Sequence, residues 1–505
     1  MVSQLSSRTE PSTAQNVQPG HQASTNHEAG LGAGRLGTAS LVFMIIAASA
    51  PLTVLAGGVP TNFAVSGLLG VPWGYLVLGL ILVFFAVGYG IMSSQIQNSG
   101  AFYAYVSEGL GNRQGIAAAI LALVSYNMMQ VGLYGIFGFS LANLINGWCG
   151  THIAWWVAAL GGWLLVAVMG VRNVDFSAKV LGILVALEFI VVAAVSVLSL
   201  GVAPEGITAE TLKPDQFFTG GIGVVLAFGI AAFMGFESGA IYSEEARDPE
   251  RTVPKATYIS VGVIALFYAF SAWAFAQGVG PSTILAQSQE LGPDLVFVWL
   301  GGYSSVAANI ANCLFITSLL AALVAFHNAA ARYFFSLGRS RVLPRVFAGA
   351  SSSGAPVAGS VAQTVIALVV VVGFAVAGRG SEMGELFPVL TLFTWLTNAA
   401  AFGLVFLLAV VSIAIMVWLN RTARQRGIFV RFIAPIVAAI GLAAVFVLVM
   451  VNFPLMIGDT GPDALVWVMP GIIIASGVLG LAWAEWLKRR RPEIYTSLHS
   501  NLDQI

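Results

Sequence analysis

The chain has 505 residues, of which 58% are hydrophobic and only 9% are charged, and its mean hydropathy is +0.88. Soluble domains carry about 25% charged residues, so these values exclude a water-soluble globular protein and make lipid the solvent for most of the chain. The 22 basic residues equal the 22 acidic ones, so the net charge gives no sign of a nucleic-acid partner, and two cysteines, Cys149 and Cys313, make neither a disulfide framework nor a metal site.

Residues 1–34 are polar, rich in Ser, Gln, Thr and Gly, and contain no early apolar run. This composition predicts a disordered tail and not a cleaved signal peptide. We expect the membrane domain to occupy residues 35–487 and a short second tail to occupy residues 488–505.

Twelve apolar segments follow, and each is long enough to cross the hydrocarbon core of a bilayer, which takes about 20 residues. They predict an all-α integral membrane protein with about twelve transmembrane helices. The three longest segments indicate either tilted helices or spans that contain a short extra piece. The predicted spans are 38–58, 70–92, 114–146, 152–171, 179–201, 219–243, 256–277, 296–335, 356–377, 386–419, 430–451 and 465–487.

The first span contains Pro51 near its middle, after the small residues Ala48, Ser49 and Ala50. Proline removes a backbone donor and clashes with the preceding turn, so we expect the helix to break here. The half-helix before the break would present a free carbonyl group, that of Ile46, and the half-helix after it would present free N–H groups. The alternative is a simple proline kink, which is common in membrane helices.

The fifth span contains one carboxylate, Glu188, among wholly apolar neighbours. It lies about nine residues into the span, roughly 14 Å along a helix that rises 1.5 Å per residue, and so near the midplane of the bilayer. Such a residue is a functional candidate, here for taking up and releasing a proton. The alternative is a permanently protonated carboxyl group that bonds a neighbouring helix. Thr317 and Ser318 of the eighth span are possible neighbours.

The sixth span places two glycines and a carboxylate inside an apolar segment, in the order Phe233, Met234, Gly235, Phe236, Glu237, Ser238, Gly239. We expect a second break here, at which the carbonyl groups of Phe233 and Met234 and the backbone of Gly235 face a ligand. Glu237 and Gly239 are expected to have structural roles, Glu237 by accepting hydrogen bonds from donors that the unwinding leaves free. A face of small residues for helix packing is the alternative.

Interrupted helices at matching positions of two inverted halves point to a substrate site at the midplane. The first and sixth spans run in opposite directions, as a five-helix unit repeated once requires. We therefore place the substrate between the two breaks. The predicted binding residues are Ile46, Ala48, Ser49, Ala50, Phe233, Met234 and Gly235, with Pro51, Glu237 and Gly239 shaping the breaks and Glu188 coupling.

Charged residues are distributed unequally between the two sides. Of the 22 basic residues, 20 fall on loops and tails of one side, and only Lys213 and Arg379 fall elsewhere. By the positive-inside rule, both termini are predicted to be cytoplasmic. The mixed cluster Glu244 to Lys255, just after the sixth span, is interpreted as a cytoplasmic loop that forms ion pairs. It accompanies no nucleophile–base pair, metal spacing or phosphate-binding loop, so we expect no enzyme activity, no catalytic residue, no metal and no cofactor.

Three motifs resemble those of the amino acid–polyamine–organocation (APC) superfamily of permeases. They are the sixth span with its exit to Lys255; the end of the second span, Gln97-Asn98-Ser99-Gly100-Ala101-Phe102-Tyr103-Ala104-Tyr105, with Ser99 at a usual glycine; and Asn328, Arg332-Tyr333, Gly338-Arg339 and Leu343-Pro344 in and after the eighth span. The chain departs from the family in its first break, where many relatives have a Gly-Ser-Gly-like turn in place of Ala48-Ser49-Ala50-Pro51.

The resemblance implies a leucine-transporter-like fold, with a five-plus-five inverted repeat and two further C-terminal helices. It implies a multi-pass protein of the plasma (inner) membrane, in contact with membrane lipid, that carries amino acids or related amines. Glu188 resembles a position at which some sodium-independent relatives carry a lysine in place of a sodium ion. We therefore expect secondary active, proton-coupled amino acid uptake by alternating access. The alternatives are a polyamine or organic amine carrier or exchanger, and a non-transporting sensor on the same scaffold.

Overall fold

A computed structural model describes residues 36–96, 101–172, 178–237, 239, 246–351, 354–457 and 464–500. The predicted tail over 1–34, the motif residues 97–100 and the acidic pair Glu244 and Glu245 lie outside these ranges. Within them the chain is helical and forms no β-strand, only one isolated bridge between Leu36 and Ala246. The all-α prediction is therefore confirmed.

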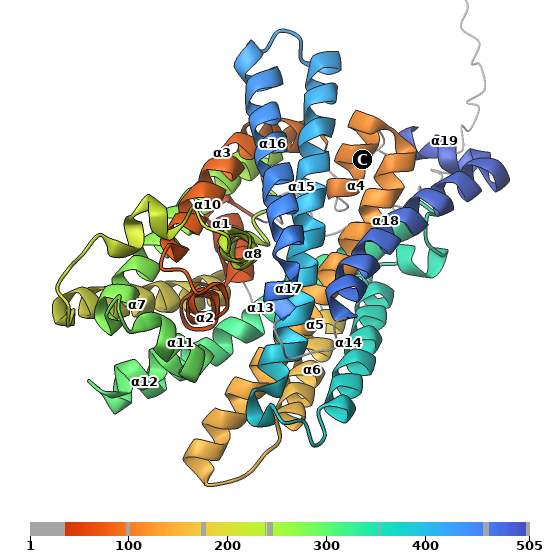
Figure 1. Cartoon of the computed structure of the whole chain (residues 1–505). Helices are drawn as coiled ribbons and strands as arrows, with labels where there is room; N and C mark the ends of the chain where they lie inside the picture. The colour runs from red at the N-terminus through yellow and green to blue at the C-terminus, as the bar shows by residue number, and fades with distance from the viewer. Residues whose placement is uncertain are drawn as a thin grey trace, which may run out of the picture.

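The helices that matter for function follow one another as in Figure 1. In chain order they are α1 (Thr38–Ser49), η1 (Thr53–Gly58), α2 (Val59–Ser66), α3 (Val71–Gln95), α4 (Ala101–Leu110), α5 (Asn112–Cys149), α6 (Trp155–Arg172), α7 (Ala178–Val202), α8 (Ile222–Phe233), α10 (Pro249–Val279), α11 (Ile284–Leu291), η5 (Gly292–Asp294), α12 (Leu295–Gly301), α13 (Ser305–Arg339), α14 (Val357–Ala377), η8 (Val389–Phe393), α15 (Thr394–Thr422), η9 (Phe429–Ile433), α16 (Ala434–Val451), α17 (Phe453–Ile457), α18 (Leu465–Arg490) and α19 (Pro492–Ser500).

Ten helices of the described chain are long and apolar enough to cross a membrane. Two shorter apolar helices, α1 and α8, belong to the two spans that the sequence predicts to be interrupted. Counting both as halves of broken spans gives the predicted twelve. That total and the inverted repeat remain predictions.

Two predicted boundaries are wrong. The eighth span begins at Ser305 and not at 296, because the chain turns at Gly302 and Tyr303. Ser304 then caps α13, its side chain accepting a hydrogen bond from the Ala307 N–H at 3.2 Å. The helix that contains the seventh predicted span begins at Pro249, so the basic and acidic residues from Pro249 to Lys255 are helical and not a loop. Proline is favoured in a first helical turn because its φ is already helical and its missing N–H is not needed there.

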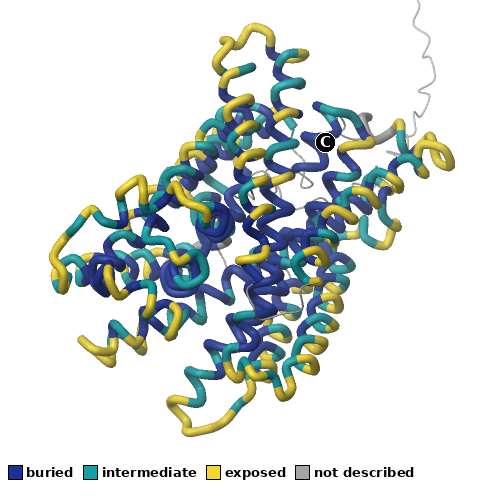
Figure 2. Tube along the Cα trace, viewed as in Figure 1, coloured by how far each residue is buried: buried dark blue, intermediate teal, exposed yellow. Residues whose placement is uncertain are grey.

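Helix α5 lies at the centre of one half of the molecule, packed against α6, α13, α15 and α18, while α3 runs along α10 in the other half. Figure 2 shows buried segments concentrated in the middle and exposed segments on the outer helices. The exposed side chains of the outer helices are largely apolar, for example Leu164, Val369 and Leu479. In water this surface would be unfavourable, so it fits a protein that faces lipid.

A buried polar network joins α5, α13 and α14. Gln130 donates from Nε2 towards His327 Nδ1 at 3.4 Å, His327 Nε2 lies 2.7 Å from Ser360 Oγ, and Gln363 donates to Gln130 Oε1. Because an amide nitrogen can only donate, Nδ1 accepts and the neutral imidazole carries its proton on Nε2. Gly170 of α6 fits against this network, since a Cβ there would lie 2.3 Å from His327 Nε2. His327 is thus a helix-contact residue.

The two ends of the bundle differ in charge. The turn between α15 and α16, with Arg421, Arg424 and Arg426, lies at the upper end of Figure 1, and the connection from α5 to α6 lies at the lower end. Cys149, the last residue of α5, is exposed at that lower end. It therefore offers a natural probe of orientation.

We expect a membrane-impermeant maleimide added to intact cells to label the unmodified chain at Cys149, because the predicted topology places the α5–α6 connection outside. The Cys149→Ser variant should not be labelled, and Gln425→Cys in that background should be labelled only after the membrane is permeabilised. Ser288, which also lies outside by the predicted topology, is unsuitable as a probe because it is buried in α11. Labelling of Gln425→Cys in intact cells, with none of Cys149, would reverse the topology.

Candidate functional site

The first span breaks at Ala50. Helix α1 ends at Ser49, Ala50 adopts a left-handed φ of 50°, and its N–H bonds the Ile46 carbonyl at 2.8 Å. The Ile46 carbonyl is therefore not free, contrary to the expectation from sequence. The Ala47 carbonyl is the one that loses its helical donor. The residue four positions later is Pro51, which has no N–H. Counting four residues back from the proline would have identified it.

Glu188 of α7 lies beside this break. Its Oε2 accepts hydrogen bonds from the Leu52 N–H at 3.3 Å and from the Ser318 hydroxyl of α13 at 2.7 Å. The Thr53 hydroxyl donates in turn to Ser318 Oγ at 3.2 Å. Glu188 is 1% exposed. The carboxyl group therefore holds the start of the second half of the span, where the unpaired N–H groups give a helix a positive end.

Of the two neighbours predicted for Glu188, one forms a hydrogen bond with it and the other does not. Ser318 bonds it directly, whereas the Thr317 hydroxyl donates to Leu314 within its own helix at 2.8 Å. The Ser49 hydroxyl bonds Tyr268 of α10, a residue that the sequence analysis did not select. A run of polar groups from α1, η1, α7, α10 and α13 thus surrounds the break.

The remaining predicted residues of the first span have different surroundings. The Ile46 side chain is buried in a cluster with Val185 of α7 and Ala321 of α13. Ala50 belongs to the main buried core, and the side chain of Ala48 lies outside the described part of the structure.

The sixth span breaks directly after α8. Residues 234–237 form a turn, with Gly235 at a φ of 103°, which residues with a Cβ rarely adopt. The Met234 N–H bonds Ala231 and the Phe236 N–H bonds Phe233, at 3.2 and 3.1 Å, so both bonds span three residues instead of four. The carbonyl groups of Ile230 and Ala232 consequently lose the donors that a continuing α-helix would give them.

Glu237 closes this turn, as the sequence predicts. Its Oε2 accepts the Gly235 N–H at 3.0 Å, and its Oε1 accepts the hydroxyl of Tyr126 from α5. Its own carbonyl accepts the Tyr89 hydroxyl of α3 at 2.9 Å. The buried side chain thereby supplies a partner to a backbone donor that the unwinding releases and joins the turn to α5, while the Glu237 carbonyl joins it to α3.

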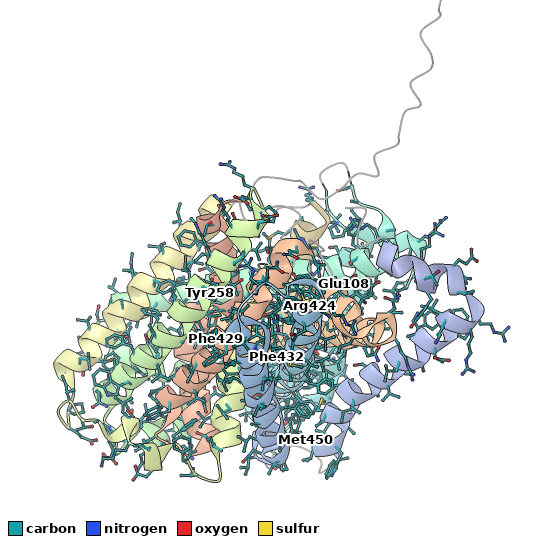
Figure 3. The ribbon with its side chains drawn as sticks, turned by 90° about the horizontal axis from the view of Figure 1, so that it is seen from above. Glu108, Tyr258, Arg424, Phe429, Phe432 and Met450 are labelled. Atoms are coloured by element: carbon teal, nitrogen blue, oxygen red, sulfur yellow. The ribbon has the colours of Figure 1, made fainter. Side chains whose placement is uncertain are left out.

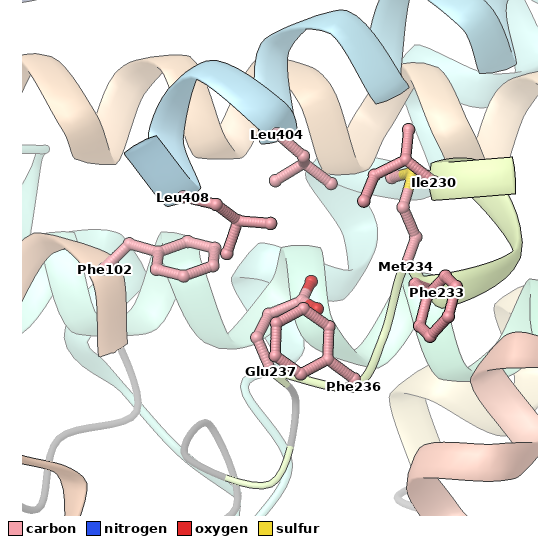
Figure 4. Close-up of a pocket in the computed structure, with 8 residues that line it drawn as sticks. All are labelled: Phe102, Ile230, Phe233, Met234, Phe236, Glu237, Leu404 and Leu408. Carbon is pink, nitrogen blue, oxygen red and sulfur yellow. The ribbon is translucent and has the colours of Figure 1, made fainter. Parts of the chain in front are cut away.

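A small cavity lies against this turn (Figure 4). It has a volume of about 10 Å³, enough for roughly one water molecule. Four residues at the break of the sixth span line it, Phe233, Met234, Phe236 and Glu237, and the sequence analysis did not select the other four, Phe102, Ile230, Leu404 and Leu408, from α4, α8 and α15. These are ordinary apolar residues, so nothing in the sequence distinguishes them from core. A ligand larger than a water molecule therefore needs the lining residues to separate.

The two interrupted spans are in contact. A Cβ on Gly239, just after the sixth-span turn, would lie 3.0 Å from the end of the Ile45 side chain of α1, which is closer than an ordinary van der Waals contact. Helix α8 also contacts α1 and η1. The breaks are therefore neighbours, although no residue of the first span lines the cavity.

Replacing Glu237 by alanine is expected to lower the free energy of unfolding by about 2 kcal/mol, because the buried Gly235 N–H and Tyr126 hydroxyl lose their acceptor. Glu237→Gln keeps an acceptor of the same shape and should lose less than half as much. Thermal unfolding in detergent measures both variants. Equal destabilisation by the two variants would contradict the capping role.

Comparisons with known proteins give consistent results. The family model described as amino acid permease matches residues 40–494. A histidine permease of Lactococcus lactis subsp. cremoris is 25% identical over 317 residues, 59% of this chain and 65% of that protein, so the match spans less than two thirds of that relative. A branched-chain amino acid permease of the same organism is 24% identical, over 64% of this chain and 71% of its own length.

The chain is also similar to two transporters whose names give other substrates. A low-affinity putrescine importer of Escherichia coli K12 is 24% identical, over 61% of this chain and 68% of that protein. Among solved structures, the crystal structure of a manganese transporter from Eremococcus coleocola has a TM-score of 0.52 and 16% identity, over 88% of this chain and 94% of the other. At that identity the similarity shows a shared fold.

Proposed function

Because the chain belongs to the amino acid permease family, we propose that it is a secondary active transporter that carries amino acids across the plasma membrane, by proton-coupled uptake with alternating access. The observation that carries the coupling is the contact of Glu188 with the Leu52 N–H at the first break. The relatives named above are permeases and an importer, which supports transport over enzyme activity.

The two breaks supply complementary groups for an amino acid. The carbonyl groups of Ala47, Ile230 and Ala232, left without helical donors, suit an ammonium group. The positive end of the half-helix that begins at Pro51 suits a carboxylate. Gly235 brings main chain to the ligand without a side chain between them. Together these groups bind a zwitterion without a charged side chain.

Glu188 and the substrate carboxylate would compete for the same positive helix end. When Glu188 is ionised, its negative charge opposes a second carboxylate nearby, in a medium that screens little. When Glu188 takes up a proton, that repulsion disappears and its bonds to Leu52 and Ser318 weaken, since charge-assisted hydrogen bonds are about twice as strong as neutral ones. The protonated form therefore binds substrate better, and this difference couples the two movements.

An organic amine is the second candidate substrate, because a relative is a putrescine importer and because Glu237 lines the cavity. A carboxylate beside the ligand would favour a second positive charge. Against this, Glu237 already bonds Gly235 and Tyr126. The amino acid therefore remains the first proposal.

Uptake of a radiolabelled panel into proteoliposomes tests the proposal. The panel contains histidine, lysine, branched-chain amino acids, γ-aminobutyrate and putrescine, each with and without an inwardly directed proton gradient. We expect at least one amino acid to accumulate above its external concentration only when the gradient is present. Accumulation of putrescine alone would replace the amino acid by an amine, and uptake that ignores the proton gradient would remove proton coupling.

A further inference from the structure

We propose that the elbow between α18 and α19 binds the head group of an anionic phospholipid. The elbow consists of Trp483, Trp486 and the basic residues 488–491. Helix α18 ends at Arg490 and α19 begins at Pro492, so the basic run lies where the chain leaves one helix and enters the next. This site is separate from the transport site and does not depend on the function proposed above.

The two tryptophans form a fixed, partly exposed platform. Their rings stack with centroids 4.7 Å apart and an interplanar angle of 13°. The Trp483 Nε1–H donates to the Val342 carbonyl, beyond the end of α13, at 3.0 Å. Even so, Trp483 is 39% and Trp486 42% exposed. Tryptophan favours the level of the membrane interface, where its ring is apolar and its N–H finds a partner.

The exposed face of α18 changes in character along its length. Val468, Ile472 and Leu479 are exposed and lie on the same face as the two tryptophans, since residues three, four and seven apart share a helix face. Arg490 continues that face one turn after Trp486, about 6 Å further along. Apolar, aromatic and basic groups thus follow one another in the order of acyl chain, glycerol and phosphate in a phospholipid.

The elbow is positively charged, and polar contacts fix its conformation. Lys488, Arg489, Arg490 and Arg491 are exposed, and Arg489 pairs with Glu485 at 2.8 Å. Figure 3 shows nitrogen-tipped side chains projecting outward from the blue helices at the right of the molecule.

Beyond the bend, the Asn112 side chain of α5 donates to the Tyr495 carbonyl of α19 at 2.8 Å, which fixes α19 in place. A fixed site binds with a smaller loss of conformational freedom than a mobile tail. The apolar face of α18 favours a lipid over a free phosphate ion, because the ion would use only the basic end. The elbow is therefore expected to hold a lipid longer than the general surface does.

Native mass spectrometry of the full chain, titrated with phosphatidylglycerol or with phosphatidylcholine of the same acyl chains, tests the proposal. We expect one tightly bound phosphatidylglycerol and no comparable phosphatidylcholine. The double variant Arg490→Gln/Arg491→Gln should bind phosphatidylglycerol roughly 25-fold more weakly, at about fivefold for each basic residue removed. Trp486→Ala should weaken it as well, without changing the thermal unfolding of the lipid-free protein, because this ring is partly exposed.

The control is Arg421→Gln/Arg426→Gln, which removes the same charge from the exposed end of α15 and the turn that follows it. We expect it to bind phosphatidylglycerol as the unmodified chain does. An equal loss in the control would mean that surface charge alone attracts the lipid and would overturn the site. Displacement of the lipid by millimolar inorganic phosphate would also overturn it, by showing that the apolar face contributes nothing.

Discussion

Replacing Glu188 by glutamine should abolish accumulation driven by a proton gradient while exchange of labelled for unlabelled substrate continues. Glutamine keeps the shape of the protonated acid and an acceptor for the Leu52 N–H and the Ser318 hydroxyl. It cannot gain or lose a proton, so substrate binding no longer depends on one. In proteoliposomes we expect the internal substrate concentration of the variant to rise no higher than the external one, with counterflow near that of the unmodified chain.

Two controls separate coupling from structure at this position. Ser318→Ala removes one partner of Glu188 but leaves the carboxyl group, so accumulation should persist, with a shifted pH dependence. Thr317→Val changes the neighbouring residue, whose hydroxyl bonds its own helix, and should transport normally. If Glu188→Gln still concentrates substrate against its gradient with an unchanged pH dependence, Glu188 is a structural carboxyl group.

Substitution of Gly235 by leucine is expected to weaken substrate binding at least about 100-fold, equivalent to roughly 2.7 kcal/mol. Two effects add. Leucine at a φ of 103° is strained, by roughly 1–2 kcal/mol for a residue forced into a left-handed conformation. Its side chain would also occupy the space in which main chain meets the ligand. Scintillation proximity binding of the substrate found in the uptake panel measures the loss.

The matched control is Gly161→Leu in α6. Gly161 is exposed and lies in a regular helix, and a Cβ added to it would meet no neighbouring atom within 4 Å. This variant should bind substrate normally. Both variants should elute as monodisperse protein, because the Gly235 turn is local and Gly161 faces outward. Near-normal affinity in Gly235→Leu would remove the substrate from this turn.

The sequence located the breaks because proline and glycine have strong local effects on a helix. Pro51 and Gly235 mark the two interruptions, and the structure places both within a residue or two of the expected positions. Glu188 and Ser318 were paired correctly because a buried carboxyl group requires a donor and few polar residues are available in these spans. Helix-breaking residues and buried polar residues in apolar spans therefore predict a site before any contact is known.

Other parts of the site could not be predicted in this way. From the sequence we expect a free carbonyl at Ile46. In the structure the left-handed Ala50 directs its N–H back to that carbonyl. Leu404 and Leu408 line the cavity because α15 crosses the sixth-span turn, and leucines facing a cavity look like leucines facing lipid. The start of α13 was misplaced because apolar α12 and α13 join almost without a polar gap. Tertiary packing decides each of these.

The amide and imidazole bonds among Gln130, His327, Ser360 and Gln363 have a mechanical consequence. If α5 slid past α13 or α14, these groups would separate in a medium that has no water to replace their partners, at a cost of about 1–3 kcal/mol for each one left unsatisfied. The three helices are therefore expected to resist sliding past one another. Any conformational change of the bundle would consequently move α5, α13 and α14 as one rigid unit.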